Sequence, residues 1–263
     1  MALHAVLALK LTTLLYEEDG PIGRITMNRP ENGNMFNPTM CRELKAVLEE
    51  TRLETRTRVL VLTGAGDRFF CIGGEKEGLE PTYSYPGVLP ILDVYEAMER
   101  HQKPVVASVN GYAVGGGHVM HVMCDLTVAK QSAVFRQVGP IMGSFDAGYG
   151  TWALEDLIGR KRAKEMWFLN EKLSAQQALD WGLVNRVVPD EKLREETDRL
   201  AQTLAARGAQ ALAAVKASFT ARTGGVAGYS RMAHDMLLRY YLETDESKEL
   251  RESFSNRSRP KAE

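Results

Sequence analysis

Three consecutive glycines, Gly115 to Gly117, open an apolar helical stretch directly after an apolar segment. Glycine has no Cβ, so such a run lets the backbone pass very close to another group and presents free amide N–H groups at a helix start. The preceding segment, residues 104–109, has the composition of a buried strand. A strand, a glycine turn and a helix in this order predict an α/β fold whose backbone amides can serve a ligand.

A second glycine-rich segment, residues 139–150, carries one carboxylate, Asp146. Amide donors combined with a single carboxylate are suited to chemistry on a carbonyl whose oxygen becomes negative. A structural alternative also exists for Asp146, because it precedes the sequence AGYGTWAL and could cap a helix there.

Strand-like and helical segments alternate along the first 189 residues, which predicts an α/β core over 1–189. Residues 190–263 are mostly helical in pattern, and the apolar stretch 234–241 is of the kind that packs against another subunit. GAGDRFFCIGGE reads as a loop. Expected strands are 11–16, 22–27, 58–63, 104–109, 125–129 and 183–188; expected helices are one from Pro38 capped by Asn37, 88–101, 117–123, 152–170, and one capped by Ser174 with Gln177.

Composition narrows the class of protein. The 263 residues have a formal net charge of −1, which gives no general attraction to nucleic acid or to an anionic membrane. The three cysteines show no paired spacing, and the N-terminal stretch lacks the basic start of a signal peptide. We therefore expect a cytoplasmic protein with no nucleic-acid or membrane partner.

Four segments resemble the crotonase (enoyl-CoA hydratase/isomerase) superfamily: MNRPENGNMFNPTM, LVLTGAGDRFFCIGGE, KPVVASVNGYAVGGGHVMHVMCDLTVA and LSAQQALDWGLVNRVVP. The resemblance implies a spiral core of repeated β-β-α units, a helical C-terminal trimerisation region, and a homotrimer or homohexamer. It also implies an acyl-CoA substrate, with coenzyme A as part of that substrate and no tightly bound cofactor. The thioester oxygen would bind the backbone amides of Gly74 and Gly116, an oxyanion hole.

Two positions depart from the hydratases of this superfamily. The positions of the two catalytic glutamates of those hydratases correspond in this sequence to Val119 and Gly139, so neither acid–base group is present at them. The segment QVGPIMGSFDAGYGT instead resembles a branch that makes or breaks carbon–carbon bonds beside a CoA thioester, represented by 2-ketocyclohexanecarboxyl-CoA hydrolase and 1,4-dihydroxy-2-naphthoyl-CoA synthase.

This branch implies two groups of site residues. The resemblance makes Asp146, Ser144, Tyr241 and Tyr85 (or Tyr83) catalytic candidates. Substrate-binding candidates are Gln137, Gly139, Trp167, His118 and Ile72. Core packing remains the alternative for Trp167 and Tyr241, and a structural role remains the alternative for His118.

The predicted reaction is hydrolytic carbon–carbon cleavage, a retro-Claisen ring opening of a cyclic β-ketoacyl-CoA or a related β-dicarbonyl. The alternative is the formation of a carbon–carbon bond, a ring-forming condensation in which bicarbonate would be required as the base. A hydratase or isomerase, or a non-catalytic CoA-binding homologue, is less favoured. Arg136 and Ile141 replace a glycine and a lysine of both branch members, which indicates a different acyl group. His118 and His121 have no evident third ligand, so no metal site is expected.

Overall fold

The computed structural model describes residues 9–75, 89–146 and 148–257. The chain divides into two compact units, Met1–Arg207 and Gly208–Glu263. The domain boundary expected after residue 189 stays a prediction, and the division between the compact units falls later in the chain. The reason is α7 (Leu193–Ala205), which packs on β3, β5 and β7 of the core instead of joining the C-terminal helices.

Two sheets form the centre of the first unit. The larger has the strand order β1-β2-β3-β5-β7-β10 and is parallel apart from the β1–β2 pair; the smaller has the order β4-β6-β8-β9 and is parallel apart from β8–β9. The strands are β1 (Leu14–Asp19), β2 (Ile22–Met27), β3 (Val59–Gly64), β4 (Phe69–Cys71), β5 (Val105–Val109), β6 (Tyr112–Val114), β7 (Leu126–Lys130), β8 (Val134–Arg136), β9 (Leu173–Ser174) and β10 (Arg186–Val188).

The chain order shows a spiral of β-β-α turns. β3 and β4 precede α2, β5 and β6 precede α3, and β7 and β8 precede α4, so each turn adds one strand to each sheet. This confirms the predicted α/β spiral core. The helices are α1 (Pro38–Leu53), α2 (Pro90–Arg100), α3 (Gly116–Val122), α4 (Trp152–Ile158), α5 (Arg160–Leu169), α6 (Ala175–Asp180), α7, α8 (Ala209–Glu243) and α9 (Asp245–Arg257), with short 3-10 turns at Pro30–Asn32, Pro140–Met142 and Asp190–Lys192.

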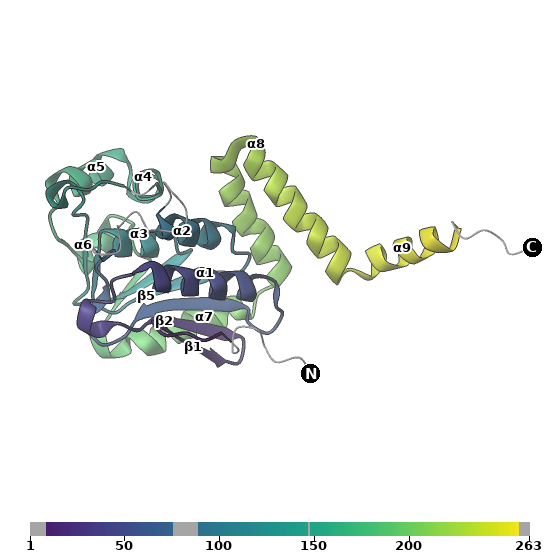
Figure 1. Ribbon diagram of the computed structural model, residues 1–263, viewed down its shortest axis with the longest axis horizontal. Helices are drawn as coiled ribbons and strands as arrows, with labels where there is room; N and C mark the ends of the chain where they lie inside the picture. The colour runs from purple at the N-terminus through teal and green to yellow at the C-terminus, as the bar shows by residue number, and fades with distance from the viewer. Residues whose placement is uncertain (1–8, 76–88, 147, 258–263) are drawn as a thin grey trace, which may run out of the picture. The chain divides into compact units, whose positions relative to one another are not determined.

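The larger sheet is covered on both faces, by α1 and α2 on one side and α7 on the other (Figure 1). Alternate residues of β3 divide between the two faces: Leu60 belongs to the main core cluster, and Val61 to the cluster that includes Leu200 of α7. Two predicted caps are confirmed. Asn37 accepts a bond from Met40 N at the start of α1, and Ser174 forms a capping box at α6.

Two element predictions were wrong. The segment taken as a loop contains β4, a strand of three residues that is too short to show a period. The helix expected over 152–170 is two helices, α4 and α5, because Gly159 between them has φ +80 and ψ 156.

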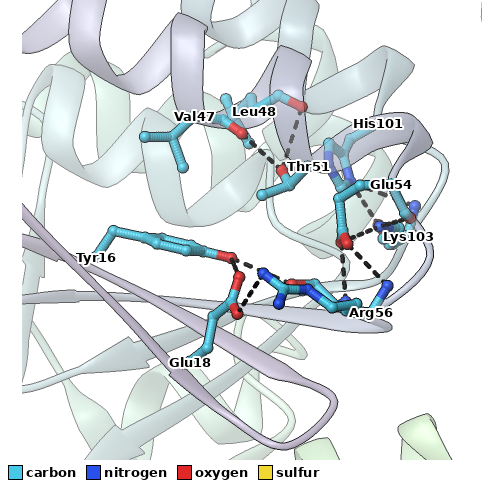
Figure 2. Close-up of polar contacts among 10 residues, drawn as sticks. Tyr16, Glu18, Val47, Leu48, Thr51, Glu54, Arg56, His101 and Lys103 are labelled. Atoms are coloured by element: carbon cyan, nitrogen blue, oxygen red, sulfur yellow. Dashed lines mark hydrogen bonds and ion pairs between the residues drawn. The ribbon is translucent and has the colours of Figure 1, made fainter. Parts of the chain in front are cut away.

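A polar network joins the ends of α1 and α2 to the start of β3 (Figure 2). Glu54, just after α1, accepts hydrogen bonds from Thr57 N at 2.8 Å and from Lys103 Nζ at 2.7 Å. Thr51 Oγ1 lies 3.1 Å from His101 Nε2, at the end of α2. The network fixes the C-terminal end of α1, whose N-terminal end leads to the candidate site.

The second unit consists of α8 and α9, and α8 bends at Gly225, where φ is 53 and ψ −138. In the described part of the chain, no helix is long and apolar enough to cross a membrane.

Candidate active site

Gly74 and Gly116 follow neighbouring parallel strands. β4 pairs with β6 with Cys71 opposite Ala113, so the chain leaves both strands at the same sheet edge. Each loop turns at a glycine with positive φ, +104 at Gly73 and +55 at Gly115. A Cβ on Gly73 would lie 3.5 Å from Gly116 N, so the two loops are in contact.

The amides of Gly74 and Gly116 are both left without a backbone acceptor in the described residues. Phe36 N donates to Gly73 O at 2.9 Å, and Phe36 O accepts from Glu75 N at 3.0 Å. Gly74 lies between these two bonds, so its own N–H points away from Phe36. Gly116 is the first residue of α3, where an N–H has no acceptor within the helix. The described residues thus present two N–H donors on neighbouring loops, neither of which has a backbone acceptor among them.

Two aromatic side chains hold this pair of glycines. The Phe36 ring lies against both, because a Cβ would meet it at 2.8 Å from Gly74 and at 2.6 Å from Gly116. The hydroxyl of Tyr95, on α2, donates to Gly116 O at 3.0 Å. Tyr95 is buried, and burial raises the pKa of its hydroxyl well above the ordinary value, so it remains a donor.

Asp146 is held by backbone donors from the turn that follows it. Oδ1 accepts from Gly148 N at 3.0 Å and from Gly150 N at 2.8 Å, and Oδ2 accepts from Thr151 N at 2.7 Å. The side chain therefore stabilises the turn that leads to α4, but the N-cap of that helix is Thr151, so Asp146 is not the cap that the structural alternative expects. A carboxylate offers about four acceptor positions, so Oδ2 keeps one for a further partner.

The side chains of Val119, Asp146 and Trp167 all lie against Gly150. A Cβ there would lie 2.7 Å from the Val119 side chain, 2.9 Å from Asp146 Oδ1 and 3.1 Å from the Trp167 ring. Trp167 Nε1 also donates to Gly150 O at 3.0 Å. Since Val119 is three residues after Gly116 on α3, this contact links the carboxylate to the helix that carries one free amide.

Trp167 also contacts Gly139, where a Cβ would lie 3.1 Å from the ring. Trp167 is buried, and its indole packs between the segments that carry Gly139 and Gly150. A larger residue at 139 would have to displace the ring or the Ser144 carbonyl oxygen, also 3.1 Å away. A glutamate at position 139 would therefore fit only if these neighbours shifted.

His118 and Gln137 are both fully buried and contact each other, with Gln137 Nε2 3.0 Å from His118 Nδ1. Burial lowers the pKa of His118 to about 3. The pKa of His121 is also lowered, well below its ordinary value, first by burial and second by charge repulsion from His118. Neither His118 nor Gln137 exposes surface to a substrate. Their placement fits the structural alternative for His118: together they join α3 to the segment after β8.

The side chains of the other predicted residues make contacts outside this cluster or lie outside the described structure. Ser144 is exposed, and its Oγ is 3.4 Å from Phe145 O. The Ile72 side chain is directed at Gly33, where a Cβ would lie 2.5 Å from it. Tyr85 and Tyr83 lie outside the described residues, as does the side chain of Tyr241, whose backbone belongs to α8.

Arg136 directs its charge to the end of α5, where Nε donates to Asn170 O at 2.6 Å. A cation is favourable at a helix C-terminus, so this side chain has a structural partner. Ile141 is 59% exposed. Across the described ranges, no three His, Cys, Asp or Glu side chains gather so that they could hold a metal ion.

Comparison with known proteins decides the family. Residues 17–263 match the family described as enoyl-CoA hydratase/isomerase. The chain belongs to the enoyl-CoA hydratase/isomerase family.

Solved structures of this family share the fold over nearly the whole chain. An enoyl-CoA hydratase subunit I from Geobacillus kaustophilus is 30% identical with a TM-score of 0.77, covering 97% of this chain and 99% of its own. An enoyl-CoA hydratase from Bacillus anthracis is 27% identical with a TM-score of 0.75, covering 95% and 98%. A monofunctional enoyl-CoA isomerase from M. smegmatis is 28% identical with a TM-score of 0.71, covering 84% and 98%.

Phe36 and Tyr95 are the site residues that sequence reasoning missed. Phe36 lies in the NGNMF segment, where nothing in the pattern separates it from other apolar residues. Tyr95 sits on the buried face of α2, and only its polar hydroxyl in an apolar stripe hints at a partner.

Proposed function

We propose that this enoyl-CoA hydratase/isomerase family member binds an acyl-CoA and stabilises the enolate of its thioester. The pair of free N–H groups at Gly74 and Gly116 carries the proposal. An enolate places negative charge on one oxygen, and two fixed N–H donors can stabilise that charge without rearranging. One such donor lowers the activation free energy by about 3–4 kcal/mol in enzymes with an oxyanion hole.

The reaction we infer is hydrolytic cleavage of a carbon–carbon bond in a cyclic β-ketoacyl-CoA. Water adds to the ring ketone while Oδ2 of Asp146 takes its proton. The bond to the α-carbon then breaks, and its electron pair forms the thioester enolate. Asp146 returns the proton to the α-carbon, which leaves an open-chain acyl-CoA with a new carboxylic acid and an overall gain of one water.

The residues at the two hydratase glutamate positions support this choice over hydration. Val119 and Gly139 occupy the two glutamate positions of a hydratase, and both are packed against Gly150 or Trp167. The ring-forming condensation remains the alternative, because it uses the same enolate in the opposite direction.

Isomerisation of an enoyl-CoA is a second candidate, favoured by a specific observation. Moving a proton between two carbons needs a single base used twice, and Asp146 is the one carboxylate in the described cluster around Gly150. The similar structure from M. smegmatis is an isomerase by name.

The test is to incubate the protein separately with 2-ketocyclohexanecarboxyl-CoA, o-succinylbenzoyl-CoA, a 3-enoyl-CoA and crotonyl-CoA, and to measure product masses and double-bond position. Gain of water on the first supports cleavage, and loss of water on the second supports condensation. A shifted double bond at constant mass supports isomerisation. Hydration of crotonyl-CoA alone would overturn the proposal.

Asp146→Asn tests the role of the carboxylate within the same assay. Asparagine can still accept the N–H groups of Gly148 and Gly150 through its single oxygen, although it no longer accepts from Thr151 N. It is a poor base, so turnover should fall by about 10²–10⁴-fold. Asp67→Asn, at an exposed aspartate in the turn before β4, is the matched control.

A further inference from the structure

Phe36 touches both halves of the proposed oxyanion hole. A Cβ on Gly74 would lie 2.8 Å from Phe36 Cε2, and a Cβ on Gly116 would lie 2.7 Å from Cε1, on the other edge of the ring. The ring therefore lies between the two loops, with one edge against each glycine.

The backbone of Phe36 fixes the ring in this position. Its N–H and C=O bond to Gly73 O and Glu75 N, the two groups that flank Gly74. Arg29 pairs with the Glu75 carboxylate at 2.6 Å, with both side chains largely shielded from solvent. Phe36 also packs against the main core cluster, and α1 begins two residues later. The ring is thus held independently of any ligand.

We propose that Phe36 is a positioning residue whose ring sets the separation of the Gly74 and Gly116 amides. The inference rests on the proposed function, since it assumes that these two N–H groups bind one oxygen. It also explains why both positions are glycine: any Cβ would collide with the ring at less than 3.0 Å.

The physical reason lies in the geometry of a shared acceptor. Both donors must lie about 2.7–3.1 Å from one oxygen, so the distance between them has a narrow range. A planar ring with two side-chain torsions is a stiff spacer, whereas an aliphatic side chain leaves the loops free to approach or separate. Misplacement of a reacting group by about 1 Å can cost on the order of 10²-fold in rate.

The direction of the ring gives a second, independent expectation. Its Cζ atom lies 3.3 Å from the Cβ position of Gly74 and 2.6 Å from that of Gly116, so the tip of the ring points between the two glycines. Phe36→Tyr would place a hydroxyl at this tip and force the loops apart, although it keeps the ring.

The experiment compares binding of acetoacetyl-CoA, a β-ketoacyl thioester whose enolate absorbs in the near ultraviolet, with binding of free CoA. In the wild-type protein, we expect tighter binding of acetoacetyl-CoA and an enolate band. In Phe36→Leu and in Phe36→Tyr, the preference over CoA should fall by roughly 10–100-fold and the band should weaken, while the affinity for CoA stays the same.

Leu200→Ala is the matched control for loss of core packing. Leu200 is buried in the cluster on the opposite face of the larger sheet, so its loss should leave the preference unchanged. Phe36→Met, which keeps most of the volume without a ring, replaces Phe36→Leu if that variant fails to fold.

The outcomes separate the two proposals. A wild-type protein that shows no preference for acetoacetyl-CoA and no enolate band overturns the proposed function, and the role of Phe36 with it. A wild-type protein with both properties, retained in full by Phe36→Leu and Phe36→Met, overturns the role of Phe36 alone.

Discussion

The Tyr95 hydroxyl donates a hydrogen bond of 3.0 Å to the carbonyl oxygen of Gly116, the residue whose amide forms half of the proposed oxyanion hole. The bond ties α2 to the first residue of α3. Tyr95→Phe removes the donor while keeping the ring. We expect the free energy of unfolding to fall by about 1 kcal/mol, measured by urea denaturation.

The same variant should lower kcat more than it raises KM, because the Gly116 amide loses its alignment toward the charge that develops in the reaction. Tyr112→Phe deletes the same atom from a half-buried tyrosine on β6 and serves as the control. A Tyr95→Phe protein with reduced stability but unchanged kcat would show that the bond serves the fold alone.

Gly150→Ala should disturb both packing and chemistry. The added Cβ would lie 2.7 Å from the Val119 side chain and 2.9 Å from Asp146 Oδ1, so one of them must move. We expect a loss of about 1–3 kcal/mol in stability together with reduced turnover. Gly208→Ala is the matched change, since its Cβ would meet nothing closer than 3.6 Å. Equal activity of both variants would argue against Asp146 as the reacting carboxylate.

Much of the fold could be predicted because its signals are local. The strand β3 begins with four consecutive apolar residues, and the Asn37 and Ser174 caps are encoded within three or four residues. The strands of the smaller sheet could not be predicted, because β4, β6 and β8 have three residues each and exist only through pairing with one another.

The candidate site divides in the same way. The glycine-rich segments around Gly74 and Gly116 stand out in the sequence because positive φ and close approach require glycine there. Their contact with Phe36, which is 38 residues before Gly74 and 80 before Gly116, depends on tertiary packing that no local pattern encodes. The burial of His118 and Gln137 against each other likewise follows from how α3 meets β8.

Buried His118 should make the protein sensitive to mild acid. Its pKa is lowered to about 3 in the folded protein from an ordinary 6.5, so the unfolded chain binds a proton that the folded chain does not. The stabilisation that comes from keeping His118 neutral is fully present above pH 6.5. It is lost as the pH falls from 6.5 towards about 3, by about 1.4 kcal/mol of unfolding free energy per pH unit. His121, whose pKa is also lowered, adds in the same direction.

His118→Gln removes this titration and can still bond to Gln137. Urea unfolding at a series of pH values below 6.5 should show a shallower dependence than in the wild-type protein. An unchanged slope in His118→Gln would mean that the imidazole is protonated within the folded protein.

Glu54 should contribute a second, more acidic transition. Burial acts to raise the pKa of this carboxyl, but the hydrogen bond and charge of Lys103 and the bonds from two backbone N–H groups outweigh it, so the pKa is lowered from 4.5 (Figure 2). The stabilisation is present above pH 4.5 and is lost as the pH falls through the folded value.

Glu54→Gln should lower the free energy of unfolding by about 1.5–3 kcal/mol at neutral pH, because it removes a charged acceptor from Lys103. Below pH 4.5 the variant and the wild-type protein should converge, whereas Glu49→Gln, at an exposed position of α1, should follow the wild type throughout. A constant difference across the whole pH range would place the effect in packing and not in the charge of Glu54.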